Sequence, residues 1–263
     1  MTDDIDQVLE RLLAAYRAGR QLALIMDYDG TLVPIVGHPR FAVLAPETRA
    51  VLKDLAALPR VAVGIVSGRS LDDLMNMVGL RGICYVGTSG LEYDLNGARF
   101  AHGNSREVSE LLARASEGLA RITQSFRGAW LERKPVGLAL HYRDVAPERI
   151  SELKSQASSV LSTFAGQICV TNGPMAFEVT PALGWTKGTA VRWLCKQTGN
   201  DVLPLYAGDH LNDADALATA AALRGIAIGV GPDAPPSAEH RLLDAAALIN
   251  VLRRLSDSMA HFE

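Results

Sequence analysis

The segment Leu22-Ala-Leu-Ile-Met-Asp27-Tyr-Asp29-Gly30-Thr31 constrains the fold of this chain more than any other. Its five apolar residues are too few for an isolated helix but suit a buried strand of a parallel sheet. The run stops abruptly at two aspartates separated by one residue. At the carboxyl edge of such a sheet, side chains and backbone amides converge on ligands. The sequence therefore predicts a first strand that delivers Asp27 and Asp29 to a binding site.

Two carboxylates at one strand end can divide chemical labour. One can attack phosphorus and coordinate a metal, while the other exchanges protons with the attacking or leaving oxygen. Gly30 would let the backbone turn tightly, and the Thr31 hydroxyl can hydrogen-bond a neighbouring acid or a phosphate. Taken alone, the segment also fits an ordinary loop with solvated aspartates. Its interpretation therefore depends on the rest of the chain.

A second buried strand is predicted at Val61–Val66, ending at Ser67-Gly68-Arg69 before a helix that begins at Ser70. A serine hydroxyl and the backbone amides of a glycine turn at a helix N-terminus can hold phosphate oxygens. A capping serine beside a turn glycine is the structural alternative. A third strand follows at Ile83–Gly87, with a hairpin predicted at Asn96-Gly97. Alternating strands and helices predict a parallel sheet with right-handed crossovers.

The pattern changes after about Asn104. A helix followed by two strands occurs twice: helix Val108–Phe126 with strands Ala129–Glu132 and Val136–Tyr142, then helix Pro147–Phe164 with strands Gln167–Thr171 and Ala176–Thr180. This composition indicates a small inserted α+β domain. Pro181 and Gly184 in the link back to the first domain are typical of a hinge. We expect an α/β fold with a Rossmann-like parallel sheet over residues 1–104 and 184–263, and an inserted α+β domain over residues 105–183.

The first domain then resumes with a helix at Thr186–Gln197 that carries Lys187 at its start. A strand at Val202–Ala207 ends at Gly208-Asp209-His210-Leu211-Asn212-Asp213. Apolar periodicity predicts the remaining elements of this domain, which are helices Asp3–Arg17, Pro46–Leu58, Ala214–Ala222 and Ala238–Leu255, and a strand at Gly225–Val230.

Four motifs therefore occur in order along the chain: Asp27-x-Asp29-Gly30-Thr31, Ser67-Gly68-Arg69, Lys187, and Gly208-Asp209-x-x-Asn212-Asp213. All except Lys187 lie at strand ends of one sheet. Phosphoryl transfer needs a nucleophile, a divalent cation, and a fixed positive charge with hydrogen-bond donors around the phosphoryl group. Mg²⁺ prefers oxygen ligands. We expect the metal ligands to be Asp27, the backbone carbonyl of Asp29, and Asp209, with support from Asp213. Lys187 would neutralise the nucleophile and the phosphate, which would also contact Thr31, Ser67 and Gly68.

Composition restricts the classes of partner. The chain has 263 residues, of which 48% are hydrophobic, and a formal net charge of −3 without a Lys/Arg-rich run, so a nucleic-acid partner is not expected. No apolar stretch is long enough to span a membrane. The acidic first residues do not resemble a signal peptide, and Cys84, Cys169 and Cys195 suit reduced core thiols, so a cytoplasmic location is expected. The oligomeric state stays open, and a monomer is compatible with the sequence.

The four motifs resemble those of the haloacid dehalogenase-like phosphatase superfamily, in order and across nearly the whole length. The insertion resembles the α/β cap of its sugar-phosphatase branch. The resemblance implies a Rossmann-like core with a cap, an aspartyl-phosphate intermediate on Asp27, hydrolysis by water that Asp29 activates, and a requirement for Mg²⁺.

A narrower resemblance lies in the surrounding residues. The segments Asp27–Ile35, Leu131–Arg143 and Phe177–Pro181 are similar to those of the trehalose-6-phosphate phosphatase family. The resemblance implies that Glu132, Lys134 and Glu178 contact the sugar, with Arg143 and Arg69 as further substrate-binding candidates. Charged side chains on a short strand can hydrogen-bond the hydroxyls of a disaccharide when a lid closes. Glu132 and Lys134 also fit a solvated strand edge.

Two segments depart from that family's pattern. Members usually carry Gly-x-His-Gly where this chain has Gly87-Thr88-Ser89-Gly90, and Gly-Asp-Asp-x-Thr-Asp-Glu where it has Gly208-Asp209-His210-Leu211-Asn212-Asp213-Ala214. The sequence favours a Mg²⁺-dependent phosphatase for trehalose 6-phosphate. A glycosyl-glycerate phosphate or a hexose phosphate remains an open alternative substrate. A non-catalytic sugar-phosphate sensor fits less well because Asp27 and Asp29 are both present.

Overall fold

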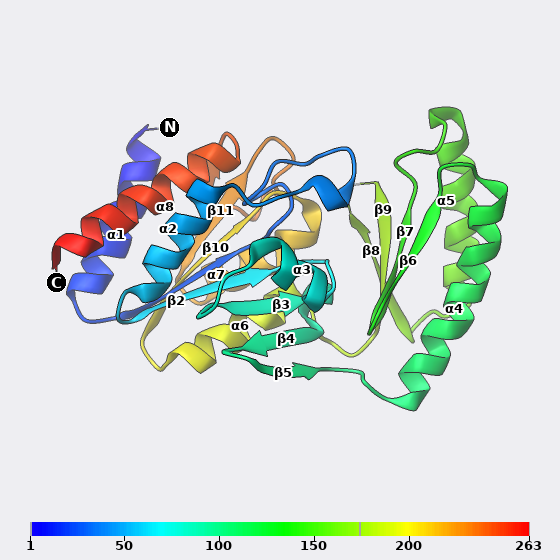
Figure 1. Ribbon diagram of the computed structural model, residues 1–263, viewed down its shortest axis with the longest axis horizontal. Coiled ribbons are helices and arrows are strands. Elements are labelled where there is room, and N and C mark those ends of the chain that lie inside the picture. Colours follow the sequence, from blue (N-terminus) through cyan, green and yellow to red (C-terminus); the bar gives the residue numbers. More distant parts are fainter. Residues whose placement is uncertain (1, 174, 263) are drawn as a thin grey trace. The chain divides into compact units, whose positions relative to one another are not determined.

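The computed structural model describes residues 2–173 and 175–262 and divides the chain into two compact units (Figure 1). The first, here the core unit, comprises Met1–Phe100 and Thr186–Glu263. The second, the inserted unit, comprises Ala101–Trp185. Each unit has its own apolar core.

The core unit is built on an eight-stranded sheet with the order β12-β11-β10-β1-β2-β3-β4-β5. The ladders from β12 to β3 are parallel, whereas β4 runs antiparallel to β3. The expected α/β fold with a mostly parallel sheet is therefore confirmed. The strands are β1 (Gln21–Met26), β2 (Val61–Val66), β3 (Cys84–Gly87), β4 (Glu92–Leu95), β5 (Ala98–Ala101), β10 (Val202–Gly208), β11 (Ile226–Val230) and β12 (His240–Leu242).

Helices cover both faces of this sheet. One face packs against α1 (Thr2–Arg17), α2 (Pro46–Ala57), α3 (Leu71–Val78) and α8 (Ala245–Met259), and the other against α6 (Lys187–Thr198) and α7 (Ala214–Ala222) (Figure 1). Successive residues of a strand point to opposite faces. Leu22 and Leu24 of β1 accordingly enter the first apolar core, while Ile25 faces Leu194 of α6 beside Gly64. Burial on both faces explains why the strands read as continuous apolar runs.

Local capping fixes where the helices begin. Pro46 lies in the first turn of α2, where its missing N–H costs no hydrogen bond. The Ser70 side chain accepts a hydrogen bond from the backbone N–H of Asp73 and starts α3. Thr186 and Thr189 cap the start of α6 reciprocally, which places Lys187 as the first residue of that helix.

The inserted unit is an antiparallel sheet with the order β6-β7-β9-β8 and two helices on one face. Its elements are α4 (Arg106–Ser125), β6 (Trp130–Lys134), β7 (Gly137–His141), α5 (Pro147–Ser162), β8 (Ile168–Gly173) and β9 (Ala176–Pro181). The apolar core between helices and sheet includes Leu119, Leu138, Leu140 and Phe177. Glu132 pairs with Ala139, and Ala139 with Glu178, so the two glutamates lie in one row on the opposite, polar face.

Two expectations were wrong. The last helix was expected to begin at Ala238, but this segment contains the short strand β12. Helix α8 begins only at Ala245, where the Asp244 side chain caps it by accepting a hydrogen bond from the N–H of Ala247. Three strand residues are too few to show a period of two. The cysteines are unpaired, as expected, but Cys169 is exposed rather than in the core. Within the described residues, no helix is long and apolar enough to cross a membrane.

Candidate active site

The candidate site lies at the carboxyl ends of three adjacent strands. In the order β10-β1-β2, Asp27 follows β1, Ser67 follows β2, and Asp209 follows β10. The sheet ladder fixes these ends because the N–H of Asp27 donates to the Ala207 carbonyl at 2.9 Å and that of Ser67 to the Val86 carbonyl at 2.9 Å. The residues on three separate segments are thereby held side by side.

Lys187 joins two of the acids in the interior. Its Nζ donates to Oδ1 of Asp27 at 2.6 Å and to Oδ1 of Asp213 at 2.8 Å. All three side chains are buried. Asp213 ends the short 3-10 turn Leu211–Asp213 and also accepts from the Tyr206 hydroxyl at 2.6 Å. The backbone N–H groups of Asp209 and His210 donate to its other oxygen at 3.2 and 3.3 Å. Asp213 therefore accepts hydrogen bonds from four donors.

Asp27, Asp209 and Asp213 offer carboxylate oxygens that lie within 4.8 Å of one another. One ammonium group faces three buried carboxylates, so two negative charges are uncompensated when all three acids are ionised. An all-oxygen, anionic, buried set is the chemistry that a hard divalent cation requires. The Thr31 hydroxyl donates to Oδ1 of Asp209 at 3.4 Å. The donor set therefore fits Mg²⁺.

The pKa values of these groups reflect the same crowding. Burial raises the pKa of Asp27 well above its ordinary value, against the effect of Lys187, and Asp213 and Asp209 raise it further. Burial and the charge of Asp213 raise the pKa of Asp209 to about 7. Burial alone would lower the pKa of Lys187, but Asp213 and Asp27 raise it above its ordinary value. Lys187 is therefore a permanent cation in the site.

Two glycines allow the acids to approach the backbone. Gly30 has a φ of +88°, and a Cβ there would lie 2.0 Å from Oδ2 of Asp209. A Cβ at Gly208 would lie 2.5 Å from the side chain of Asp213. Any larger residue at either position would displace a carboxylate of the cluster.

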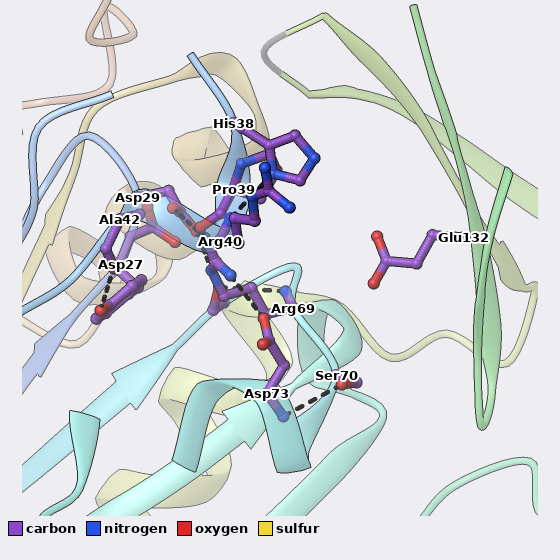
Figure 2. A network of polar contacts seen from close by, with 12 residues as sticks. Asp27, Asp29, His38, Pro39, Arg40, Ala42, Arg69, Ser70, Asp73 and Glu132 are labelled. Atoms are coloured by element: carbon purple, nitrogen blue, oxygen red, sulfur yellow. Dashed lines mark hydrogen bonds and ion pairs between the residues drawn. The ribbon is translucent and has the colours of Figure 1, made fainter. Parts of the chain in front are cut away.

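Asp29 is not part of the carboxylate cluster. Its two oxygens accept from Nε and Nη2 of Arg69 at 2.7 and 2.8 Å (Figure 2). Arg69 also contacts Asp73 and the Pro39 carbonyl. Its backbone N–H donates to Oγ of Ser67 at 3.2 Å. The guanidinium that we expected to bind substrate is thus engaged with Asp29 in this structure.

The turn Thr88–Gly90 packs against two segments of the site. Thr88 and Ser89 have φ values of +45° and +54°, which side chains rarely adopt and which cluster at functional sites. The Thr88 N–H donates to the Arg69 carbonyl at 2.6 Å and the Ser89 N–H to the Ser67 carbonyl at 2.9 Å. A Cβ at Gly90 would lie 2.5 Å from the Thr186 carbonyl. This turn therefore links the Ser67–Arg69 segment to the start of α6.

Asp215 of α7 fixes the other side of the α6 N-terminus. The Thr186 hydroxyl and the backbone N–H of Gly188 both donate to its Oδ2, the second at 3.2 Å. Sequence reasoning missed Asp215, Tyr206 and Asp73, because a polar residue inside a helix or strand carries no signal of its own. The close spacing of Asp215 to Asp213 was the one available hint.

In the inserted unit, the polar sheet face gathers the other predicted residues. Lys134 donates to Glu178 at 2.5 Å, and Glu132 contacts Nε2 of His141 at 2.9 Å. The Trp130 ring stacks on the His141 ring, with centroids 3.9 Å apart. Arg143 lies just beyond the end of β7. In the sequence, these charged groups and the half-buried aromatic stack beside them were visible only as separate residues.

Comparison with known proteins decides the family. The trehalose-phosphatase family model matches residues 25–240. The chain belongs to the trehalose-phosphatase family. It is accordingly a phosphoric monoester hydrolase. It is 33% identical to a probable trehalose-phosphate phosphatase 2 of Oryza sativa subsp. japonica over 90% of this chain and 69% of that protein. It is 32% identical to the trehalose 6-phosphate phosphatase RA3 of Zea mays over 94% of this chain and 73% of that protein.

Solved structures share the fold. The C-terminal domain of a trehalose-6-phosphate phosphatase from C. albicans superposes with a TM-score of 0.85 at 22% identity, covering 95% of this chain and 96% of that one. An Aspergillus fumigatus trehalose-6-phosphate phosphatase gives a TM-score of 0.67 at 26% identity, covering 97% and 98%. A haloacid dehalogenase-like hydrolase from Bacteroides thetaiotaomicron gives 0.65 at 15% identity, covering 90% and 100%.

Stability of this trehalose-phosphatase family member should depend on pH and Mg²⁺ together. Because the pKa of Asp209 is raised to about 7 from an ordinary 3.8, the folded protein holds more protons than the unfolded chain in this window. Its metal-free stability should therefore fall as the pH rises from about 4 to about 7. Mg²⁺ at 100 times its Kd should restore about 2.7 kcal/mol at pH 7.5 and much less at pH 5, where protons compete.

Thermal unfolding with and without Mg²⁺ at both pH values measures this increment. Asp209→Asn should abolish it, whereas Asp201→Asn, an exposed partner of Arg20, should leave it unchanged. Equal increments at pH 5 and pH 7.5 would contradict the buried carboxylate site.

The support from the Thr88–Gly90 turn can be tested with a pair of glycines. Gly90 and Gly97 both have positive φ, but only Gly90 packs against another segment. Gly97→Ala should cost about 1–2 kcal/mol through its backbone conformation alone and leave activity unchanged. Gly90→Ala should cost more and lower kcat/KM up to about 100-fold by displacing Lys187 and Ser67. Equal stability losses with unchanged activity in both variants would remove the turn from the site.

Proposed function

We propose that this protein hydrolyses trehalose 6-phosphate to trehalose and inorganic phosphate, with Mg²⁺ as cofactor. The observation that carries the proposal is the buried cluster in which Lys187 bridges Asp27 and Asp213 beside Asp209, in a chain of the trehalose-phosphatase family. This cluster supplies a nucleophile, a fixed cation and metal ligands at one sheet edge.

In the first half-reaction, an oxygen of Asp27 attacks phosphorus and the bond to the sugar oxygen breaks. Asp29 donates its proton to that leaving oxygen, which departs as the sugar hydroxyl. Lys187 offsets the charge of Asp27 and of the phosphoryl group. Ser67, Gly68 and Thr31 are the candidates for hydrogen bonds to the phosphate. Mg²⁺, held by Asp27, Asp209 and Asp213 with the Asp29 carbonyl, would neutralise charge on the phosphoryl oxygens.

In the second half-reaction, Asp29 takes a proton from water, and the water oxygen attacks the phosphorus of the aspartyl phosphate. The bond to Asp27 breaks, which releases inorganic phosphate, returns Asp27 as a carboxylate and leaves Asp29 with a proton in place of the one that it gave up in the first half-reaction. Asp29 suits this exchange because its side chain is 35% exposed, whereas that of Asp27 is 6% exposed. A partly exposed acid can trade protons with water and substrate.

We assign recognition of the sugar to the polar face of the inserted unit. Glu132, Lys134 and Glu178 offer charged acceptors and donors for sugar hydroxyls. The stacked rings of Trp130 and His141 offer a flat surface for an apolar sugar face. Arg143 is a further candidate. Binding energy from this remote part of the substrate would be used to orient the phosphate.

Another sugar phosphate, such as a glycosyl-glycerate phosphate or a hexose phosphate, is the second candidate. Ser89 and His210 favour it, because both differ from the usual family residues and both lie beside the site: Ser89 bonds the Ser67 carbonyl, and the N–H of His210 bonds Asp213. A sensor without activity is disfavoured, since the described chain retains Asp27, Lys187, Asp209 and Asp213 as one connected cluster.

A panel of sugar phosphates tests the substrate by phosphate release. Trehalose 6-phosphate should give the highest kcat/KM, and Asp27→Asn should abolish release from every substrate while leaving the fold intact. Glu132→Ala should lower kcat/KM on trehalose 6-phosphate, with a loss of about 1–3 kcal/mol in transition-state stabilisation. The loss should be far smaller on a small aryl phosphate that lacks the sugar.

Arg133→Ala is the matched control for this series. It lies on the same strand, but its side chain donates to Ser116 of α4 on the opposite face at 2.8 Å. It should preserve the ratio of the two activities. Equal losses of Glu132→Ala on both substrates would exclude this face from sugar recognition, and a clear preference for another panel member would overturn the substrate.

A further inference from the structure

Arg69 forms a bidentate ion pair with Asp29, the residue to which we assign proton transfer. Its Nε lies 2.7 Å from Oδ2 of Asp29 and its Nη2 lies 2.8 Å from Oδ1, so both carboxylate oxygens are held by one planar group (Figure 2). Paired hydrogen bonds of this kind fix orientation as well as distance. A lysine at this position could supply the charge but not the second bond.

The same guanidinium is held from two other segments. Its Nη1 donates to Oδ2 of Asp73 in α3 at 2.6 Å, and its Nη2 donates to the Pro39 carbonyl at 2.7 Å. Each of its three nitrogens is therefore engaged within the protein. The Arg69 side chain is 8% exposed, against 35% for Asp29. A ligand in solvent thus meets Asp29 far more readily than Arg69.

Both ends of the Arg69 residue are anchored as well. Its backbone N–H donates to Oγ of Ser67, and its carbonyl accepts from Thr88 at 2.6 Å. The guanidinium carbon lies 5.4 Å from the centroid of the fully buried Tyr28 ring, whose hydroxyl donates to the Ala42 carbonyl at 2.7 Å. Tyr28 stands between Asp27 and Asp29 in the chain. These contacts therefore fix the position of Arg69, and Arg69 in turn holds Asp29.

We propose that Arg69 is a positioning residue, which holds the carboxylate of Asp29 in the orientation needed for proton transfer, and that Asp73 and the Pro39 carbonyl hold Arg69 in turn. The proposal rests on the role given to Asp29 under the proposed function. In this role Arg69 does not bind the substrate directly, as the sequence suggested, but acts on the reaction through Asp29.

The two roles differ in how they depend on the leaving group. An alkyl phosphate, such as a sugar 6-phosphate, needs a proton on its departing oxygen, whereas a nitrophenyl phosphate departs as a stable phenolate. The value of kcat/KM reports the first chemical step, in which only the alkyl phosphate needs the acid. Loss of a positioned general acid should therefore fall on the alkyl phosphate, while loss of a phosphate contact should fall on both.

The test is a double-mutant cycle of Arg69→Gln and Asp29→Asn, with kcat/KM measured on p-nitrophenyl phosphate and on the best alkyl phosphate of the panel. Arg69→Gln should lower kcat/KM on the alkyl phosphate by about 100-fold and on the aryl phosphate by less than about threefold. In the Asp29→Asn background it should change either value by less than about twofold, because the group it positions is gone. Arg69→Lys should recover part of the loss.

Two variants of α3 complete the design. Asp73→Asn, which weakens one support of Arg69, should lower the alkyl activity by about tenfold with the same leaving-group pattern. Asp72→Asn is the matched control, since Asp72 lies in the same turn but pairs with Arg99 at the surface, and its activity should be unchanged. These readings stand even where Arg69→Gln lowers the melting temperature.

Equal losses on both substrates, or an Arg69→Gln effect that persists in the Asp29→Asn background, would overturn the proposal and assign Arg69 to the substrate. An Asp29→Asn variant with wild-type kcat/KM on the alkyl phosphate would instead contradict the role of Asp29 itself, and the Arg69 proposal with it. The cycle therefore separates failure of this inference from failure of the proposed function.

Discussion

The ion pairs that Lys187 makes with Asp27 and Asp213 are the interaction on which the rest of the site depends. Removing the Lys187 ammonium would leave these buried carboxylates without a compensating charge and would cost about 3–5 kcal/mol. The sheet fixes Asp27, the caps of α6 fix Lys187, and a short turn after β10 fixes Asp213. The sheet, the α6 caps and this turn together hold the Lys187 ammonium between the two carboxylates. A divalent metal ion would balance the negative charge that Lys187 leaves uncompensated.

Much of the fold could be predicted because the parallel strands are buried on both faces. Continuous apolar runs marked β1, β2 and β10, and each ended in residues with polar chemistry. Parallel strands share one carboxyl edge, so the proximity of Asp27, Ser67 and Asp209 followed from topology alone. The three-residue strand β12 could not be predicted, since it pairs with β11 through a length too short to carry a period.

The supporting residues could not be predicted, because their roles depend on contacts between distant segments. Arg69 appeared as part of a phosphate motif, but its partners Asp73 and Pro39 lie in α3 and in the short 3-10 helix Pro39–Phe41, which share no sequence signal. The positive φ of Thr88 and Ser89 is equally invisible in the sequence, where glycine would have been the expected residue. The motifs thus predicted the candidate reacting groups, and only the structure showed which residues contact and hold them.

A crystal structure of the protein with Mg²⁺ and beryllofluoride, which mimics a phosphoryl group on a carboxylate, tests whether Asp27 is the nucleophile of a metal-containing site. We expect beryllium bonded to a carboxylate oxygen of Asp27, with Lys187 beside it and a metal ion held by Asp27 and Asp209. Beryllium on Asp29, or a metal ion away from the three buried carboxylates, would contradict this expectation.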